Sequence, residues 1–339
     1  MSPDHRPPLA VLFGCAGTIP SAEERAFFST INPLGFILFK RNCVDPAQLM
    51  GLVAALRDTV GRADAPVLID QEGGRVQRLG PPYWPAYPAP ARLTALSGPE
   101  AREAAALDAR LIADDLARLG ISVDCFPLLD LGLPGADPVI GDRAWSGDPA
   151  EVAWLARAAA EGLIEGGVLP VVKHVPGHGR ATVDSHRDLP RVTVSRAVLE
   201  KSDFAPFRSL NDMPWAMTAH VVYEAIDPEL PATLSPRIIG EVIRGSIGFD
   251  GVLVSDDLSM GALSGGLGAR AIAALAAGCD LILHCNAHMR EMREIAEAAG
   301  PMSEIAQRRL ARGEAMRRAP AAFDRLAAET RLHQLMAAA

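Results

Sequence analysis

Residues 168–179 read VLPVVKHVPGHG, so a short apolar run stands directly before a group of ionisable side chains. The run Val168–Val172 is rich in β-branched residues and follows two glycines, which is typical of a buried parallel strand. Lys173 and His174 come where that strand is expected to end. In α/β folds, and above all in (β/α)8 barrels, the carboxyl ends of the strands carry the chemistry, because loops there vary without disturbing the core. This stretch therefore predicts a strand with a functional site at its carboxyl end.

Seven more apolar runs of similar length occur along the chain, and segments with helical periodicity separate them. The runs span residues 9–13, 35–39, 66–69, 121–125, 215–218, 252–255 and 281–283. Helices are expected between them, for example over residues 47–60, 98–119 and 149–166, the last of which starts with a proline in its first turn. Repeated strand–helix units are typical of α/β folds, and eight strands imply closure into a TIM barrel.

The length of the chain fits one domain. It has 339 residues, and a barrel of this kind needs about 250 plus insertions. Because no linker or charge block divides the sequence, we expect a single catalytic domain over residues 1–339. The segment after Gly300 is expected to form helices that pack on the barrel. Residues 80–92, with five prolines and three aromatic residues, are expected to form either a rigid loop around the barrel mouth or a surface connection with no role.

Charge and composition narrow the range of partners. The formal net charge is -8 and the pI is about 5.5, which argues against a nucleic acid or an anionic membrane surface. No run approaches the roughly 18 apolar residues that span a bilayer. The arginines at 308–312 and 317–318 alternate with small and apolar residues as on the solvated face of a helix. We therefore expect a small-molecule substrate, no nucleic-acid or membrane partner, and a monomer.

Cysteine usage points to a reducing compartment. The five cysteines are odd in number, scattered and mostly within apolar runs, which fits reduced buried thiols better than a disulfide framework or a zinc site. The stretch Leu12–Cys15 faintly resembles a lipoprotein cleavage site. The residues before it lack a cationic region, and the apolar stretch is short. We expect a cytoplasmic protein.

Polar residues recur at the ends of the predicted strands and would meet at one mouth of the barrel. They are Asp70, Asp130, Arg143, Lys173, His174, His220, Asp256 and Asp257. A set rich in carboxylates with fixed cations suits a neutral polyhydroxylated ligand, because an acceptor and a donor can hold each hydroxyl at once. Any single member could be a helix cap or a buried ion pair instead, but the ensemble predicts a sugar site.

The histidine spacing does not indicate a metal site. His174 and His178 are four residues apart, but Pro176-Gly177 between them breaks any helix, so the two rings need not share a face. His284 and His288 lack a third ligand at metal spacing. We expect neither a metal nor a cofactor. We expect His178 to stabilise its loop by hydrogen bonding and to take no part in catalysis.

Asp184 and His186 stand one residue apart in a predicted loop, so the carboxylate can hydrogen-bond the imidazole. An imidazole can give a proton to a leaving alcohol and then take one from water near neutral pH. Together with a carboxylate nucleophile at another strand end, this dyad would complete a two-step displacement.

Three motifs, taken together, resemble a known family. They are KHVPGHG at 173–179 with DSH at 184–186, IDQEGGRVQR at 69–78, and SDDLSMGA at 255–262. In order and spacing they are similar to the glycoside hydrolase family 3 β-N-acetylhexosaminidases of the bacterial NagZ type, over about Leu9 to Asn286. The resemblance implies a single (β/α)8 barrel that removes a terminal β-linked N-acetylglucosamine with retention of anomeric configuration.

The resemblance also implies roles for single residues. Asp256 matches the nucleophile, His186 the general acid/base, and Asp184 the carboxylate that orients His186. Asp257 belongs to the same motif but carries no catalytic role there. The positions that bind the sugar at the non-reducing end are matched by Asp70, Arg78, Arg143, Lys173 and His174. Larger relatives usually borrow an acid/base glutamate from a second domain, so a histidine on the barrel's own loop suits a single-domain chain.

The chain departs from the family pattern at three places. Val175 stands where Phe is common, Gly261 stands where Glu is frequent, and Arg180-Ala181-Thr182 varies the loop before Asp184. These are loop or packing positions. We expect them to adjust loop mobility or aglycone preference rather than the reaction.

The cellular role implied by the resemblance is peptidoglycan recycling. The substrate would be N-acetylglucosamine linked to 1,6-anhydro-N-acetylmuramic acid, with or without peptide. Three alternatives remain open: a family 3 β-glucosidase, a phosphorylase that transfers the sugar to phosphate, and a non-catalytic sugar-binding barrel.

Overall fold

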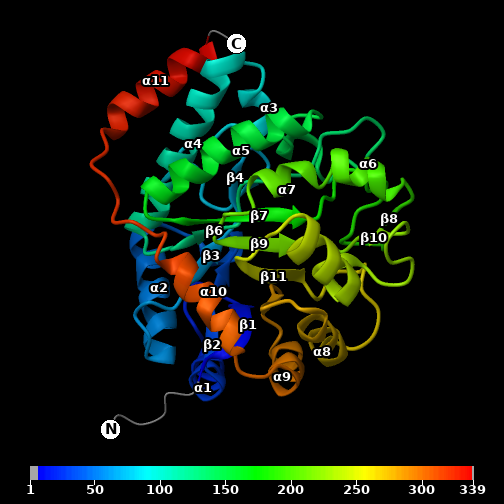
Figure 1. Cartoon of the computed structure of the whole chain (residues 1–339). Coiled ribbons are helices and arrows are strands. Elements are labelled where there is room, and N and C mark those ends of the chain that lie inside the picture. The colour runs from blue at the N-terminus through cyan, green and yellow to red at the C-terminus, as the bar shows by residue number, and fades with distance from the viewer. Residues whose placement is uncertain (1–6, 338–339) are drawn as a thin grey trace.

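A computed structural model describes residues 7–337 and contains a closed barrel of eight parallel strands with helices packed around it (Figure 1). The strands are β1 (Leu9–Gly14), β2 (Pro33–Leu38), β3 (Val67–Ile69), β6 (Val123–Asp124), β7 (Leu169–Val175), β9 (Trp215–Thr218), β11 (Val252–Asp257) and β12 (Leu281–His284). Each pairs with the next in the chain, and β1 pairs with β12 to close the ring. The predicted (β/α)8 barrel is confirmed.

Each predicted apolar run overlaps one barrel strand, and two strands extend two or more residues beyond their predicted carboxyl ends. β7 continues to Val175 and β11 to Asp257, because their backbones stay paired with the neighbouring strands. Lys173, His174 and Asp256 therefore lie within strands rather than in the loops that follow. A strand fixes a side chain more firmly than a loop does, which suits residues that must bind or react.

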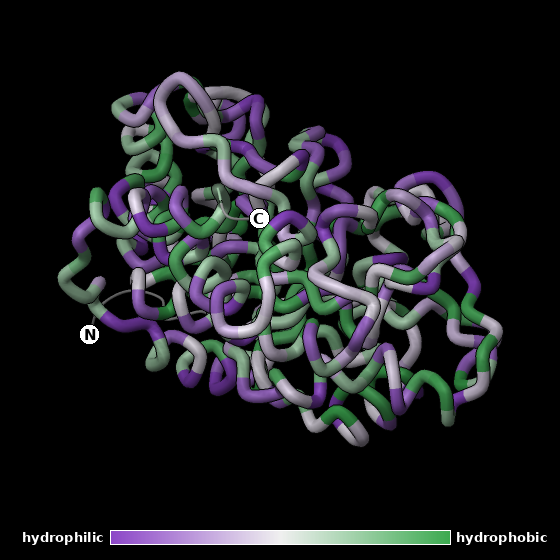
Figure 2. Tube along the Cα trace, turned by 90° about the horizontal axis from the view of Figure 1, so that it is seen from above, coloured by the Kyte–Doolittle hydropathy of each residue, from purple (hydrophilic) through white to green (hydrophobic). Residues whose placement is uncertain are grey.

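Apolar side chains fill the barrel and the layer between barrel and helices. One cluster lies inside the ring and takes alternate residues from the strands, as the two-residue repeat of a strand requires. Examples are Leu12, Val171, Trp215 and Val254. A larger cluster joins the outer faces of the strands to the helices. Hydrophobic segments run through the middle of the molecule, and hydrophilic ones are frequent along its periphery (Figure 2).

The three predicted helices form within one residue of their expected ends, as α2 (Pro46–Val60), α4 (Gly98–Arg118) and α5 (Pro149–Glu165). Asp45 and Asp148 cap α2 and α5, and a proline opens each helix. Other helices around the barrel are α1 (Ala22–Ile31), α6 (Arg196–Lys201), α7 (Ala205–Ser209), η4 (Ile238–Ser246), α8 (Leu267–Ala277) and α9 (Met289–Ala298).

Short strands and short helices lie in the loops at the carboxyl ends of the barrel strands. The hairpin of β4 (Gln71–Gly73) and β5 (Val76–Gln77) follows β3 directly. The others are η1 (Lys40–Asn42), α3 (Pro90–Leu93), η2 (Gly141–Arg143), β8 (Arg191–Val192), β10 (Val222–Tyr223) and η3 (Ala232–Leu234).

The last two helices pack on different parts of the barrel. Met302, just before α10 (Glu304–Glu314), and Ala306 in its first turn join the apolar cluster inside the ring, so α10 covers the amino-terminal end of the strands. Helix α11 (Arg325–Ala337) lies along α4 (Figure 1). Arg325 pairs with Asp114 and Asp115 of α4 at 2.9 and 2.6 Å.

The proline-rich residues 80–92 run along the outside of the barrel wall. The Tyr87 hydroxyl donates to Asp115 of α4 at 2.5 Å, and Tyr87 O accepts from Gly74 N. None of these residues lines the cavity at the barrel mouth described below. The placement fits the second of the two expectations, a surface connection, while its lack of a role stays a prediction.

All five cysteines lie in the described part of the chain as free thiols, and Cys15, Cys125 and Cys279 are buried. Over residues 7–337, no helix is both long and apolar enough to cross a membrane.

Replacing Asp108 with asparagine is expected to raise the melting temperature at neutral pH by a few degrees. Asp108 is buried in α4, and its Oδ1 has no hydrogen-bond partner among the described residues. Burial raises its pKa well above the ordinary value, so the folded state binds a proton that the unfolded state releases near pH 4. This group therefore costs stability increasingly as pH rises above about 4. Thermal melts of Asp108→Asn and the native chain should diverge between pH 4 and pH 8; parallel curves would contradict the prediction.

Candidate active site

A cavity of about 360 Å³ opens at the carboxyl ends of the barrel strands, where the polar residues were predicted to meet. All five predicted sugar-binding residues line it, together with the predicted nucleophile and acid/base. They are Asp70, Arg78, Arg143, Lys173, His174, Asp256 and His186. Asp184 lies behind His186. The cavity thus brings together side chains from the third, fourth, fifth and seventh strand–loop segments of the barrel.

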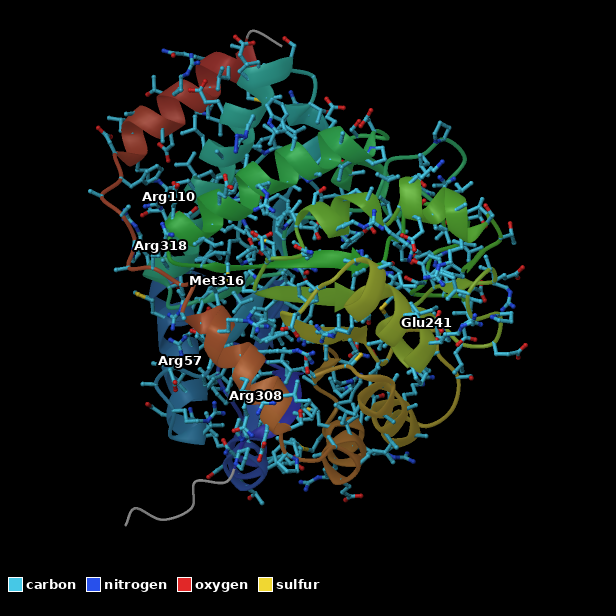
Figure 3. The ribbon with its side chains drawn as sticks, in the orientation of Figure 1. Arg57, Arg110, Glu241, Arg308, Met316 and Arg318 are labelled. Atoms are coloured by element: carbon cyan, nitrogen blue, oxygen red, sulfur yellow. The ribbon has the colours of Figure 1, made fainter. Side chains whose placement is uncertain are left out.

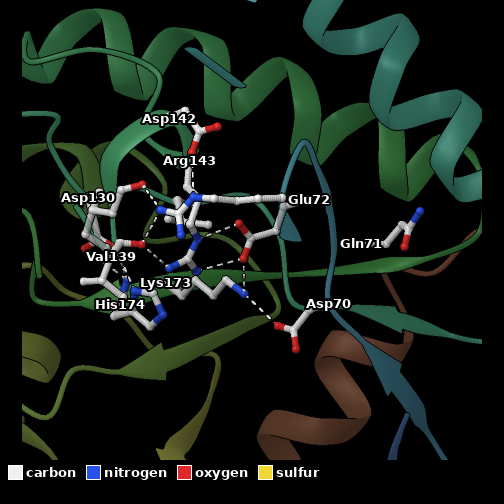
Figure 4. Close-up of polar contacts among 12 residues, drawn as sticks. Asp70, Gln71, Glu72, Asp130, Val139, Asp142, Arg143, Lys173 and His174 are labelled. Atoms are coloured by element: carbon white, nitrogen blue, oxygen red, sulfur yellow. Dashed lines mark hydrogen bonds and ion pairs between the residues drawn. The ribbon is translucent and has the colours of Figure 1, made fainter. Parts of the chain in front are cut away.

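The ammonium group of Lys173 is held between two carboxylates. Its Nζ lies 2.8 Å from Asp70 Oδ1 and 2.7 Å from Glu72 Oε1 (Figure 4). Burial alone would lower the pKa of Lys173, but the two carboxylates raise it above its ordinary value. Lys173 is therefore charged at neutral pH, and its position is fixed from two sides.

Glu72 also binds Arg143 through a two-pronged ion pair. Arg143 Nε and Nη2 donate to Glu72 Oε2 and Oε1, each at 2.9 Å. Burial alone would raise the pKa of Glu72, but Arg143 and Lys173 lower it below its ordinary value. One buried carboxylate therefore orients two of the predicted sugar-binding cations (Figure 4).

Sequence reasoning named Asp70 and overlooked Glu72. The signal was present, because successive side chains of an extended chain point to opposite faces. Asp70 and Glu72 therefore face the same side, while Gln71 points away from them (Figure 4). Gln71 instead accepts from the backbone N–H groups of Arg78 and Leu79 and so fixes the start of the loop that presents Arg78.

Besides Lys173, Asp70 binds Arg78, because its Oδ2 accepts a hydrogen bond from Arg78 Nη2 at 3.0 Å. Burial alone would raise the pKa of Asp70, but Lys173 and Arg78 hold it well below the ordinary range. Asp70 is thus an ionised acceptor at the cavity wall.

His174 is oriented by Asp130, which lies in the loop after the fourth strand, as predicted. Asp130 Oδ2 is 2.7 Å from His174 Nδ1, and Asp130 Oδ1 accepts from His178 N at 2.6 Å. Burial alone would raise the pKa of Asp130, but His174 lowers it. The carboxylate fixes the ring of His174 so that its other nitrogen is free to bind a ligand.

Asp256 lies near the end of β11 and lines the cavity. Its Oδ1 accepts from the N–H of Asp257 at 2.8 Å. Burial alone would raise the pKa of Asp256, but attraction to His174 and His220 and the Asp257 N–H lower it. The Asp256 carboxylate is therefore ionised at neutral pH, as a nucleophile must be.

Asp257, its neighbour, is engaged in the structure of the turn. Its carboxylate accepts from Ser259 N at 3.1 Å, from Ser259 Oγ at 2.6 Å and from Cys285 N at 3.3 Å. The ring of His220, which is buried behind the site, donates from Nε2 to Asp257 O at 3.0 Å. Asp257 and His220 thus hold the turn after the strand that carries Asp256.

Asp184 and His186 form the hydrogen-bonded pair that their spacing predicted. Asp184 Oδ1 lies 2.7 Å from His186 Nδ1 and also accepts from His186 N at 2.9 Å. Burial alone would raise the pKa of Asp184, but these hydrogen bonds from His186 lower it. The other nitrogen of His186, Nε2, forms no hydrogen bond with the described residues, and this exposed residue lines the cavity.

The loop before His186 is anchored at several points. His178 Nε2 lies 3.0 Å from Ser185 Oγ, which agrees with the structural role expected for His178. Burial lowers the pKa of His178 to about 4, so its ring is neutral. Arg180, one of the departures from the family pattern, pairs with buried Asp203 at 2.7 Å.

The volume of a cavity alone would not identify this one as the active site. A larger one, of about 530 Å³, lies at the amino-terminal ends of β6 and β7 and is lined by Arg57, Arg317 and Arg318 among others. Arg57 belongs to α2, and Arg318 lies in the segment after α10 (Figure 3). The carboxylates at the strand ends belong to the cavity at the barrel mouth. Over residues 7–337, no group of three or more His, Cys, Asp or Glu residues is arranged to hold a metal ion.

Comparison with known proteins points to one family. The glycosyl hydrolase family 3 N-terminal domain matches residues 15–315 of this chain. A protein named beta-hexosaminidase from Alkalilimnicola ehrlichii is 44% identical over 283 residues, which cover 81% of this chain and 80% of that protein.

Solved structures agree with the sequence match. NagZ from Neisseria gonorrhoeae superposes with a TM-score of 0.87 at 33% identity, over 98% of this chain and 99% of that one. The same protein has been solved in complex with N-trifluoroacetyl-D-glucosamine. A family 3 β-N-acetylglucosaminidase from Paenibacillus gives a TM-score of 0.80 at 35% identity, and the match covers 96% of this chain but 61% of that longer chain.

Proposed function

The chain belongs to glycosyl hydrolase family 3 and is a β-N-acetylhexosaminidase of that family, and we propose that it is a retaining exo-enzyme acting through Asp256 and His186. The observation that carries the proposal is one cavity lined by Asp256, by His186 and by the five residues that resemble the family's sugar-binding positions. A binding protein has no need of an ionised carboxylate and an oriented imidazole in one cavity.

The proposed reaction has two displacements. In the first, the Asp256 carboxylate attacks the anomeric carbon while His186 gives its proton to the departing oxygen, which yields a glycosyl-enzyme ester and a free alcohol. In the second, His186 takes a proton from water as the water oxygen attacks the same carbon and Asp256 leaves as a carboxylate. Each step inverts the carbon, so the released sugar keeps its β configuration.

The remaining wall residues suit a terminal sugar. Asp70 offers a carboxylate acceptor, while Lys173, Arg78 and Arg143 offer donors held in place by Asp70 and Glu72. A sugar hydroxyl group can donate a hydrogen bond to such an acceptor and accept one from such a donor. The cavity volume of about 360 Å³ is of the size that holds one small ligand, which supports removal of single end residues.

The natural substrate that we propose is N-acetylglucosamine β-linked to 1,6-anhydro-N-acetylmuramic acid, with or without its peptide. Cleavage would place the enzyme in cytoplasmic peptidoglycan recycling. Similarity to NagZ supports this proposal.

Turnover of aryl β-N-acetylglucosaminide, aryl β-glucoside and the anhydro-disaccharide, each with and without phosphate, tests the function. We expect hydrolysis of both N-acetylglucosaminides, with β-N-acetylglucosamine as the first product by ¹H NMR and no effect of phosphate. Faster turnover of the glucoside would indicate a β-glucosidase, and N-acetylglucosamine 1-phosphate would indicate a phosphorylase. Tight binding of N-acetylglucosamine without any turnover would indicate a sugar-binding barrel.

A further inference from the structure

The loop that carries His186 is docked on the turn that follows Asp256. Gly261 N donates to His186 O, and Ala262 N donates to Ser185 O, each at 3.1 Å. Both acceptors belong to the His186 loop, and both donors belong to the turn after β11. Met260, directly before Gly261, lines the same cavity as His186. The two hydrogen bonds therefore join the segments that carry the proposed nucleophile and the proposed acid/base.

The approach of the two segments requires a glycine at position 261. A Cβ there would lie 2.7 Å from Arg187 O and 2.9 Å from His186 O. Both are backbone atoms, so neither can turn away as the end of a flexible side chain could. Gly261 has no positive φ, so the position demands space rather than an unusual backbone conformation.

The turn is a rigid platform for this contact. Asp257 binds Ser259 through two hydrogen bonds. Arg270 of α8 donates to Leu258 O at 2.6 Å and to Met260 O at 3.2 Å. Because β11, its turn and α8 are tied together, the Gly261 and Ala262 N–H groups have a fixed position relative to Asp256.

On the loop side, the docked segment is short and is held at Ser185. The Ser185 side chain contacts His178, and its carbonyl accepts from Ala262. The Asp184 carboxylate then accepts hydrogen bonds from both the backbone N–H and the ring of His186. The position of the backbone at residues 185–186 thus sets where the imidazole lies.

We propose that Gly261 is a positioning residue for His186: its lack of a side chain lets the acid/base loop dock on the nucleophile's turn in register with Asp256. The inference rests on the proposed role of His186. It predicts that a methyl group at position 261 displaces the loop and weakens proton transfer, while the binding of the terminal sugar at Lys173 and Asp70 is unaffected.

Gly261→Ala tests the proposal with two leaving groups. A 2,4-dinitrophenolate leaves without protonation, whereas a phenolate needs the acid. Since a small displacement of an acid/base can cost about a hundredfold, we expect kcat/KM for phenyl β-N-acetylglucosaminide to fall about tenfold to a hundredfold. The value for the dinitrophenyl substrate should change less than about threefold. His186→Ala should show the same selectivity to a greater degree.

A second measurement needs no activity. Arg187 is exposed in the docked loop, and undocking should speed tryptic cleavage after it in Gly261→Ala. Gly51→Ala is the matched control, because a Cβ added at this exposed position of α2 meets no atom within 4 Å. Equal losses for both leaving groups, native kinetics, or an unchanged cleavage rate would overturn the proposal. If the native chain hydrolyses neither substrate, the proposed function fails, and the cleavage rate alone still decides whether Gly261 docks the loop.

Discussion

Replacing Asp256 with alanine is expected to lower turnover of an aryl β-N-acetylglucosaminide by about 10⁴-fold or more, because no other group can form the glycosyl-enzyme ester. The side chain lines the cavity at the end of β11, and its pKa is lowered despite burial, so the native carboxylate is ready to attack. Initial rates on the native and variant proteins give this ratio directly. A melting curve for the variant checks that its barrel is intact.

Mass spectrometry after reaction with a fluorinated, slowly released substrate analogue should locate the trapped sugar on Asp256. Asp257→Asn is the matched control. Its carboxylate holds Ser259 and Cys285, so asparagine, which keeps one acceptor oxygen, is a better replacement than alanine. We expect Asp257→Asn to form the adduct at Asp256 and to lose at most about tenfold in kcat. Equal loss in both variants, or an adduct on another carboxylate, would show that the nucleophile is misassigned.

The sequence was most informative about the strands, which appear in it as short runs of apolar residues. Apolar runs such as Leu9–Phe13 and Val252–Ser255 are buried from both sides in a parallel barrel, so each run alone marks a strand. Polar residues that follow such runs must then face the same end of the barrel. This is why the sequence alone predicts Asp70, Lys173 and Asp256 at one mouth of the barrel.

Contacts between distant loops could not be derived in the same way. The docking of Gly261 against His186 joins residues 75 positions apart through backbone atoms, and backbone atoms leave no mark in the side-chain pattern. Likewise, the proline-rich residues 80–92 allowed two placements, and the bond from Tyr87 to Asp115 and the absence of these residues from the cavity lining select the outer wall. Local patterns predict elements, whereas the pairing of loops depends on the three-dimensional packing of the whole ring.

Replacing Glu72 with glutamine is expected to lower kcat/KM by about a hundredfold, because Lys173 and Arg143 would be misplaced and a misplacement of about 1 Å can cost about that much. Glu72 is fully buried. Among the described residues, it is the only carboxylate that forms an ion pair with both Lys173 and Arg143. Glutamine has nearly the same shape but no charge. The two cations would then repel each other, and their donors would no longer point at the sugar. Affinity for N-acetylglucosamine, measured by calorimetry, should weaken in parallel.

Asp124 provides the matched control for the loss of a buried carboxyl group. It is also fully buried, on β6, and its Oδ1 accepts from Gln71 N at 3.0 Å. Burial raises its pKa well above the ordinary value and so favours its neutral form, and Asp124→Asn should change kcat/KM by less than about threefold. Glu72→Asp, which keeps the charge but shortens the side chain, should fall between the two. If Glu72→Gln and Asp124→Asn behaved alike, burial rather than charge would explain Glu72, and the view that it holds Lys173 and Arg143 for the substrate would have to be abandoned.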